Sequence, residues 1–179
     1  MQTHERNEED YRRLIRDVED FPQAGVAFKD ITPLLADRDA FAELIADMSA
    51  PFRDSNVDVV VGIEARGFIL AAPVALALHA GFVPIRKGGK LPWAVHAESY
   101  ELEYGAGHLE VHQDAVAPNQ RVLIVDDVLA TGGTAAATAR LVERMGATPV
   151  GFSFALELLV LDGRSKIAEL PTFSLVSYR

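Results

Sequence analysis

The chain has 179 residues, of which 49% are hydrophobic, and this is enough to build one domain with a sizeable core. Its 17 basic and 26 acidic residues give a net charge of -9, which argues against a nucleic-acid-binding surface. No cysteine is present, so disulfides and thiolate metal sites are excluded. We therefore expect residues 1–179 to form a single domain that binds no nucleic acid.

The sequence also argues against a membrane protein. Its first ten residues, MQTHERNEED, are too charged for a signal peptide. The longest stretch without formal charge, residues 67–85, approaches the length of a membrane span, but Pro73, Gly81 and Pro84 interrupt it. A buried helix followed by a core strand explains this stretch better, and we expect a cytoplasmic protein with no membrane partner.

Apolar side chains recur at helical spacing in two N-terminal segments, which are separated by a turn-rich, aromatic stretch at residues 21–33. One helical stripe consists of Tyr11, Leu14, Ile15 and Val18, and the other of Phe41, Leu44, Ile45, Met48 and Phe52. Further helices are predicted at residues 67–79, 135–145 and 164–170.

Short apolar or alternating runs predict strands at residues 57–62, 82–85, 99–104, 108–112, 122–125, 150–157 and 173–177. The runs at 99–104 and 108–112 alternate like a hairpin around Gly105 and Gly107. Because most of the other strands alternate with helices, the sequence predicts an α/β fold with a mostly parallel central sheet and helices on both faces.

Residues 122–134, VLIVDDVLATGGT, form the most informative segment, which we call the signature. A buried strand leads into Asp126 and Asp127, then into a turn where Gly132 and Gly133 let the backbone approach a ligand, and then into a helix. A glycine turn that opens a helix presents unpaired N–H groups to a phosphate. The hydroxyls of Thr131 and Thr134 add donors, and the two carboxylates suit sugar hydroxyls. The signature therefore predicts a sugar-phosphate site, although an ordinary strand–turn–helix with acidic residues at the sheet edge is the plainer alternative.

Two further segments lie at predicted strand ends, where ligands of open α/β sheets bind. Glu64 and Arg66 follow the strand at residues 57–62, and Arg86, Lys87 and Lys90 follow the strand at 82–85. The second group is the densest basic cluster of an acidic chain, so we interpret it as a pyrophosphate site. The alternatives are a charged pair at a helix start and a solvated basic loop.

The signature resembles that of the phosphoribosyltransferases, which bind phosphoribosyl pyrophosphate (PRPP). The Glu-Ala-Arg-Gly segment that contains Arg66 is similar to the pyrophosphate loop of the members that use adenine. By this resemblance, Ala130 joins residues 126–127 and 131–134 in binding the phosphate and ribose of PRPP or AMP. Arg66, Arg86, Lys87 and Lys90 would hold pyrophosphate, the basic loop partly across a homodimer interface.

The resemblance also implies a base site and a lid. A hood at about residues 20–34 would bind the purine through Ala27, Phe28 and Lys29, with Leu158 as the opposite wall. Lys29 stands where arginine is commoner in the family, and Ala24 where proline is commoner. A mobile β-ribbon lid at about residues 93–112 would carry Tyr104 and the catalytic Glu103, which manages a purine proton.

The resemblance implies a type I phosphoribosyltransferase-like fold and a purine salvage reaction that converts adenine and PRPP to AMP and pyrophosphate. Mg²⁺ would arrive with PRPP and have no strong protein ligand, with Asp126 or Asp127 reaching it through water. Ala130 replaces the aspartate of the hypoxanthine–guanine members, which favours adenine. The alternatives are a phosphoribosyltransferase for a 6-oxopurine and a PRPP-sensing regulator, but the chain lacks the basic face of a DNA-binding regulator.

Overall fold

The computed structural model describes residues 6–102 and 105–179. The strands are β1 (Arg16–Val18), β2 (Phe28–Asp30), β3 (Val59–Ile63), β4 (Gly81–Lys87), β5 (Val95–Leu102), β6 (Gly105–His112), β7 (Arg121–Leu129), β8 (Thr148–Leu158) and β9 (Thr172–Tyr178). The helices are α1 (Glu8–Arg12), α2 (Thr32–Ala36), α3 (Arg38–Ser49), α4 (Arg66–Ala77) and α5 (Gly133–Arg144). Short 3₁₀ segments are η1 (Ala50–Phe52), η2 (Leu159–Leu161) and η3 (Gly163–Ile167).

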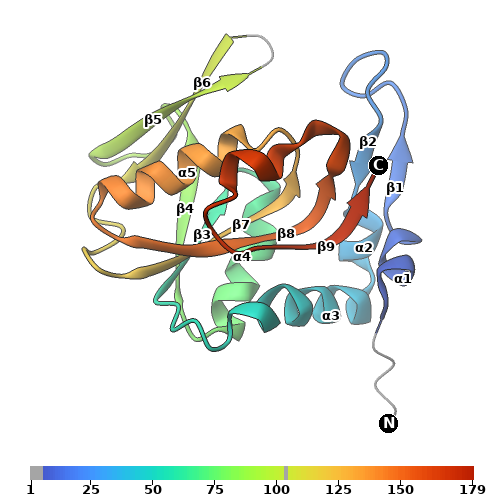
Figure 1. The fold of residues 1–179 in the computed structure, drawn as a ribbon, viewed down its shortest axis with the longest axis horizontal. Helices are drawn as coiled ribbons and strands as arrows, with labels where there is room; N and C mark the ends of the chain where they lie inside the picture. The colour runs from blue at the N-terminus through green and yellow to red at the C-terminus, as the bar shows by residue number, and fades with distance from the viewer. Residues whose placement is uncertain (1–5, 103–104) are drawn as a thin grey trace.

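The main sheet has the strand order β5-β6-β4-β3-β7-β8-β9 (Figure 1). The five adjacent strands β4, β3, β7, β8 and β9 run parallel to one another. Strands β5 and β6 form an antiparallel hairpin, and β6 pairs antiparallel with the edge of β4. The predicted mostly parallel α/β sheet is therefore confirmed. None of the helices in the described part of the chain combines the length and hydropathy that a membrane span requires.

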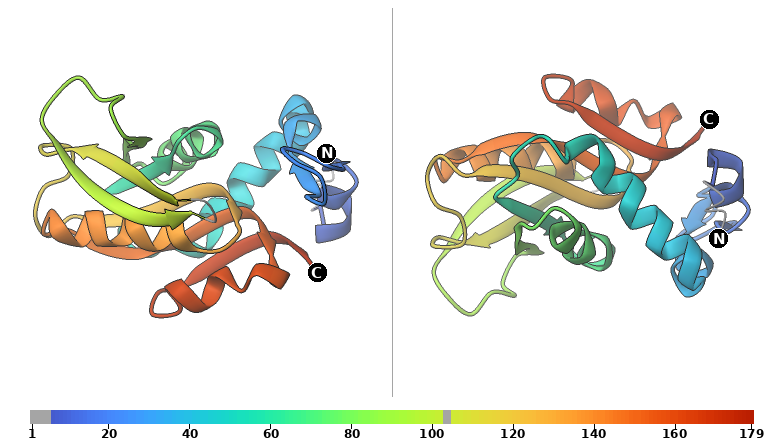
Figure 2. Two further views of the ribbon diagram at one scale, coloured as in Figure 1. Left: turned by 90° about the horizontal axis from the view of Figure 1, so that it is seen from above. Right: turned by 90° about the horizontal axis from the view of Figure 1, so that it is seen from below.

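Side chains of the central strands alternate between two cores, one on each face of the sheet. Val59 and Val61 of β3 pack in the same cluster as Leu141 of α5, and Val60 packs in the other cluster with Leu70 of α4. Figures 1 and 2 show α5 on one face of the sheet and α3 and α4 on the other. Burial on both faces explains why the β3 and β7 sequences are apolar throughout.

The strand order reverses between β3 and β7. The chain passes from β3 through α4 to β4 on one side, and from β7 through α5 to β8 on the other. The loops that leave β3 and β7 therefore diverge to opposite faces and open a crevice at the carboxyl ends of these strands. This crevice is where the ligand site of an open α/β sheet is expected.

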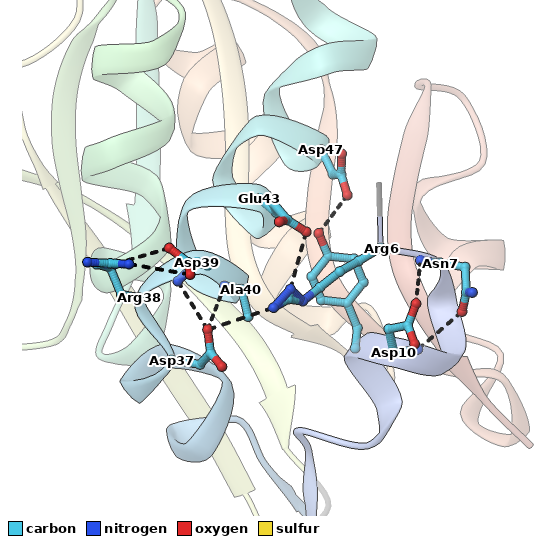
Figure 3. A network of polar contacts seen from close by, with 10 residues as sticks. Arg6, Asn7, Asp10, Asp37, Arg38, Asp39, Ala40, Glu43 and Asp47 are labelled. Atoms are coloured by element: carbon cyan, nitrogen blue, oxygen red, sulfur yellow. Dashed lines mark hydrogen bonds and ion pairs between the residues drawn. The ribbon is translucent and has the colours of Figure 1, made fainter. Parts of the chain in front are cut away.

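The N-terminal stripe does not form one helix, and this prediction was wrong. Helix α1 ends at Arg12, and Val18 lies instead in β1, which pairs antiparallel with β2. Figure 3 shows how the start of the chain is fixed: Arg6 contacts Glu43 of α3 at 3.4 Å and Asp37 at 3.9 Å. The chain can bend after α1 because α3 holds the residue that precedes α1, Arg6, and β2 pairs with β1.

The segments predicted as hood and lid each contain strands of an antiparallel pair. The segment at 20–34 contains β2, which forms a separate two-stranded sheet with β1 (Figure 1). The segment at 93–112 contains the β5–β6 hairpin, and Glu98 of β5 accepts a 2.7 Å hydrogen bond from Arg140 of α5. Arg144 donates to the carbonyl of Ala97 at 2.8 Å. The base of the hairpin is thus docked on the helix that follows the signature.

Candidate active site

The two signature carboxylates lie at the carboxyl end of β7 in different environments. Asp127 is 5% exposed, and its Oδ2 lies 2.5 Å from Nε of Arg66. Burial, together with the nearby charge of Asp127, raises the pKa of Asp126 well above its usual range. The Asp127 N–H donates to Asp126 Oδ1 at 2.9 Å. Asp127 is therefore held in an ion pair with Arg66. The ionised form of Asp126 is disfavoured in the free protein, and a hydroxyl donor or a cation would stabilise it.

The turn between β7 and α5 leaves backbone donors open. Gly132 has a φ of +73°, which glycine adopts without steric cost, and it stands at the N-cap of α5. No side chain in the described part of the chain caps this helix. The N–H groups of its first turn and the positive end of its dipole therefore face the crevice, as a phosphate group requires.

The turn is supported from behind by Gly163, the first residue of η3. A Cβ on Gly163 would lie 2.7 Å from the Gly132 nitrogen and would also collide with the Ala130 carbonyl. Real Cβ atoms essentially never come this close. The signature turn therefore rests directly on the backbone of a segment some 30 residues further along the chain, and only glycine fits there.

Arg66, the first residue of α4, joins the signature to the hood. Its Nε binds Asp127, and its guanidinium carbon lies 4.7 Å from the centroid of the Phe28 ring. The next residue, Gly67, packs so closely that a Cβ there would lie 2.6 Å from Asp126 Oδ1. Because the Arg66 side chain is still 38% exposed, it can contact a ligand in the crevice.

The basic loop is organised by Glu64, whose side chain is 8% exposed. Glu64 accepts hydrogen bonds from Arg86 Nε at 3.2 Å, from the Lys87 N–H at 3.1 Å and from Lys90 Nζ. Burial opposes ionisation of Glu64, but the bonds from Lys90, Lys87 and Arg86 hold its pKa below the usual range. Two of the predicted pyrophosphate ligands are thus paired with a carboxylate.

A cavity of about 450 Å³ brings several of these groups together. Its lining residues are Ile63, Glu64, Ala65, Arg66, Lys87, Tyr100, Leu109, Asp126, Asp127, Val128, Leu129, Ala130, Thr131, Gly132, Thr134, Ala135 and Phe154. The cavity therefore unites most of the signature with Arg66 and Lys87. Three other predicted ligands do not line the cavity themselves. Gly133 lies between the lining residues Gly132 and Thr134, and Arg86 and Lys90 form ion pairs with the lining residue Glu64.

The predicted base-binding residues do not line this cavity. Ala27 is exposed, Phe28 is half-buried against Arg66, and Leu158 packs at the end of β8. The Nζ of Lys29 lies 2.5 Å from Asp17 and 4.2 Å from the centroid of the Tyr178 ring. These four residues therefore lie outside the cavity, and the contact between Arg66 and Phe28 connects the cavity to the predicted base-binding segment.

Comparison with known proteins identifies the family. A model of the phosphoribosyl transferase domain matches residues 30–167. An adenine phosphoribosyltransferase of Myxococcus xanthus is 55% identical over 94% of this chain and 92% of its own length. The chain belongs to the adenine phosphoribosyltransferase family. Another member, from Thermobifida fusca, is 57% identical over 88% of this chain and 90% of its own length.

Solved adenine phosphoribosyltransferases have the same fold. The Rhodothermus marinus structure aligns with a TM-score of 0.92 at 50% identity, covering 95% of this chain and 97% of its own. The Saccharomyces cerevisiae structure, complexed with an imino-altritol bisphosphate and adenine, aligns with a TM-score of 0.89 at 38% identity, covering 94% of this chain and 97% of its own. The type I phosphoribosyltransferase-like fold expected from the signature is thus confirmed, and the chain is a transferase.

Two residues in or beside the cavity, Tyr100 and Gly163, were not predicted from the sequence. Tyr100 lines the cavity, and burial raises its pKa. Its ring packs so closely on Gly107 that a Cβ on Gly107 would lie 2.5 Å from Cζ of Tyr100. Strand alternation puts Tyr100 on the face opposite Glu101, but it does not predict the cavity. Gly163 carries no sequence signal beyond a turn. The predicted catalytic Glu103 and the lid residue Tyr104 lie outside the described residues.

Proposed function

We propose that this chain transfers the phosphoribosyl group of PRPP to adenine, forming AMP and pyrophosphate. The observation that carries this proposal is the cavity in which the signature turn, the two signature carboxylates and two cations converge at the carboxyl ends of β3 and β7. The high identity to adenine phosphoribosyltransferases over most of the chain supports the choice of adenine.

The phosphate and ribose of PRPP fit the two ends of the signature. The 5-phosphate would accept hydrogen bonds from the first N–H groups of α5 and from the hydroxyls of Thr131 and Thr134. The ribose hydroxyls would donate to Asp126 and Asp127. This arrangement fixes the sugar, and orientation of the reacting atoms supplies a large part of the acceleration in such a transfer.

Pyrophosphate would bind at the β3 side of the cavity, where Arg66 and Lys87 face it. Arg86 and Lys90 both form ion pairs with Glu64, which itself lines the cavity. We infer that pyrophosphate takes the place of Glu64 as their partner. Charge on the departing pyrophosphate is then balanced by cations while the ribose C1–oxygen bond breaks and the C1–nitrogen bond to the purine forms.

Mg²⁺ fits this site as an ion that arrives on the substrate. Within the described residues, no group of three or more His, Cys, Asp or Glu side chains could hold a metal. Mg²⁺ commonly uses one or two carboxylates, water and substrate phosphates in place of a complete protein cage, and Asp126 or Asp127 could reach it through water. When bound, it would neutralise charge on the pyrophosphate leaving group.

A base-competition assay tests the proposed function. The protein would be incubated with PRPP, Mg²⁺ and equimolar adenine, hypoxanthine and guanine, and each nucleotide would be quantified. We expect AMP to form far faster than IMP or GMP. Preferential formation of IMP or GMP would establish a 6-oxopurine enzyme instead, and PRPP binding without turnover of any base would establish a PRPP sensor.

Glu103 is proposed to manage the purine proton during transfer. Its replacement in Glu103→Gln keeps the hydrogen-bonding reach but removes proton exchange, and a positioned carboxylate typically contributes about 10²–10⁴-fold. We expect kcat with adenine to fall at least about tenfold while the KM for PRPP stays nearly constant. Glu101→Gln is the control and should have a much smaller effect. Equal effects of the two substitutions would remove Glu103 from this role.

A homodimer is proposed, with the outer face of α4 as its interface. Ile69 and Leu76, seven residues apart on this helix, are 45% and 77% exposed, and Phe82 at the start of β4 is 39% exposed. No Asp, Glu, Lys or Arg occurs between Gly67 and Ile85, so the face is apolar as well as exposed. Because Phe82 and Arg86 lie on the same strand, β4, a second copy seated here would lie on the strand that carries the start of the basic loop.

Leu76→Glu is expected to convert this dimer to a monomer, since a carboxylate at the centre of an apolar interface loses its hydration. Size-exclusion chromatography with light scattering would measure the change. Val160→Glu is a matched control because Val160 is 73% exposed but lies on η2. A monomeric wild-type protein, or a dimer that survives Leu76→Glu, would contradict the proposed interface.

A further inference from the structure

The end of the C-terminal strand adjoins both elements that carry the walls of the proposed base site. Tyr178 of β9 pairs in register with Leu158 of β8, which is the wall on the sheet side. The ring of Tyr178 also lies 4.2 Å from Nζ of Lys29, the residue that follows Phe28 in the hood. Tyr178 thus links the elements that carry both walls, through its backbone pairing with β8 and through its side-chain contact with Lys29 of β2.

Helix α1 fixes this strand end in place. The guanidinium carbon of Arg12 lies 4.6 Å from the centroid of the Tyr178 ring, and Arg12 Nη2 donates to the Ser177 carbonyl at 2.8 Å. The Ser177 N–H donates in turn to Glu8 at 2.9 Å. Tyr11 of the same helix donates to Asp47 of α3 at 2.7 Å, so α1 is anchored on the main body. Contacts with α1 therefore fix the position of the Tyr178 ring.

The hood needs a support because it is small. Strands β1 and β2 have three residues each, and an isolated two-stranded hairpin is marginal in water. Lys29 can hold it through two contacts, the 2.5 Å ion pair with Asp17 and the cation–π contact with Tyr178. The first joins β1 to β2, since Asp17 pairs with Lys29 in register, whereas the second ties Lys29 to the main sheet.

We propose that Tyr178 is a positioning residue that sets the separation of Phe28 from Leu158, and thereby the fit of the purine. The proposal rests on the proposed function, because it assigns the slot between these two residues to adenine. Tyr178 is not among the residues that line the cavity, which come from β3, β4, β5, β6, β7, β8, α4, α5 and the loops that join them. Its influence should therefore fall on the base and not on PRPP.

The test compares Tyr178→Leu with Tyr178→Phe, which keeps the ring. A cation–π contact of this kind corresponds to about three- to tenfold in affinity. We expect Tyr178→Leu to raise the KM for adenine by that factor, with kcat and the KM for PRPP within twofold of wild type, and Tyr178→Phe to restore the wild-type value. Phe173→Leu is a matched control, because Phe173 is a half-buried aromatic residue at the other end of β9.

The outcomes separate this inference from the proposed function. If wild-type protein forms AMP and Tyr178→Leu leaves the KM for adenine unchanged, or raises both KM values alike, the positioning role is wrong and the function stands. The same holds if Phe173→Leu reproduces the effect, because the strand would then act only through stability. If wild-type protein forms no AMP from adenine, the proposed function itself fails.

Discussion

Replacing both signature carboxylates, Asp126→Asn with Asp127→Asn, is expected to lower kcat/KM for PRPP by about 10²–10⁴-fold. Each carboxylate can accept a charge-assisted hydrogen bond from a ribose hydroxyl, and each such bond contributes about 1.5–3 kcal/mol. The loss of Asp127 also releases Arg66, which is held 2.5 Å away. Steady-state kinetics with PRPP varied at saturating adenine would measure the effect. Unchanged kcat and KM in a folded double variant would contradict the ribose assignment.

The single replacement Asp126→Asn provides an internal control, because it should stabilise the free protein. Burial and the charge of Asp127 raise the pKa of Asp126 in the folded protein. Between the ordinary Asp pKa and this raised pKa, Asp126 therefore keeps a proton in the folded protein that it loses in the unfolded chain. The contribution of this group to stability therefore falls as pH rises from the ordinary Asp pKa through the raised value. At neutral pH, removing the ionisable group should raise Tm by at least about 2 °C, with a smaller gain at pH 4. A lower Tm at neutral pH would show that Asp126 is structural.

The sheet could be predicted from the sequence because its signal is local. Val59–Ile63 and Val122–Val125 are short, β-branched and apolar on both faces, and each leads through a turn into a periodic helix. Such a run, with its β-branched residues, is typical of a parallel strand covered on both sides. The signature turn was predictable for the same reason, since Gly132 needs a positive φ and the helix start supplies donors.

The structure of the hood could not be predicted in detail because it depends on contacts between residues far apart in the sequence. Tyr11, Leu14, Ile15 and Val18 have helical spacing, but the chain leaves the helix after Arg12 and Val18 pairs with Phe28 in a strand. Pairing with residues ten or more positions away outweighs a marginal helical preference. The contacts of Lys29 with Tyr178 and of Arg86 with Glu64 are likewise tertiary, and no spacing rule reports them.

Gly163→Ala is the second substitution for which we expect a large effect, with kcat/KM for PRPP falling about 10²-fold. The added methyl group would lie 2.7 Å from the Gly132 nitrogen, so the signature turn must move away from the position that receives phosphate. The neighbouring segment cannot yield easily, because Arg164 is paired with the buried Glu157 and donates to the Thr172 carbonyl at 2.9 Å. A shift of about 1 Å in a binding group can cost about 10²-fold in rate.

Gly81→Ala separates this effect from the general cost of replacing a glycine. A Cβ on Gly81 would meet no heavy atom closer than 3.7 Å, and Gly81 starts β4 at the end of the sheet opposite the cavity. Calorimetric titration with PRPP should therefore show wild-type affinity for Gly81→Ala and markedly weaker binding for Gly163→Ala. Overpacking also destabilises by about 1–3 kcal/mol, so both variants would be compared at a temperature where circular dichroism shows them folded. Wild-type PRPP affinity in folded Gly163→Ala would mean that the turn tolerates displacement and that its contact with η3 serves only packing.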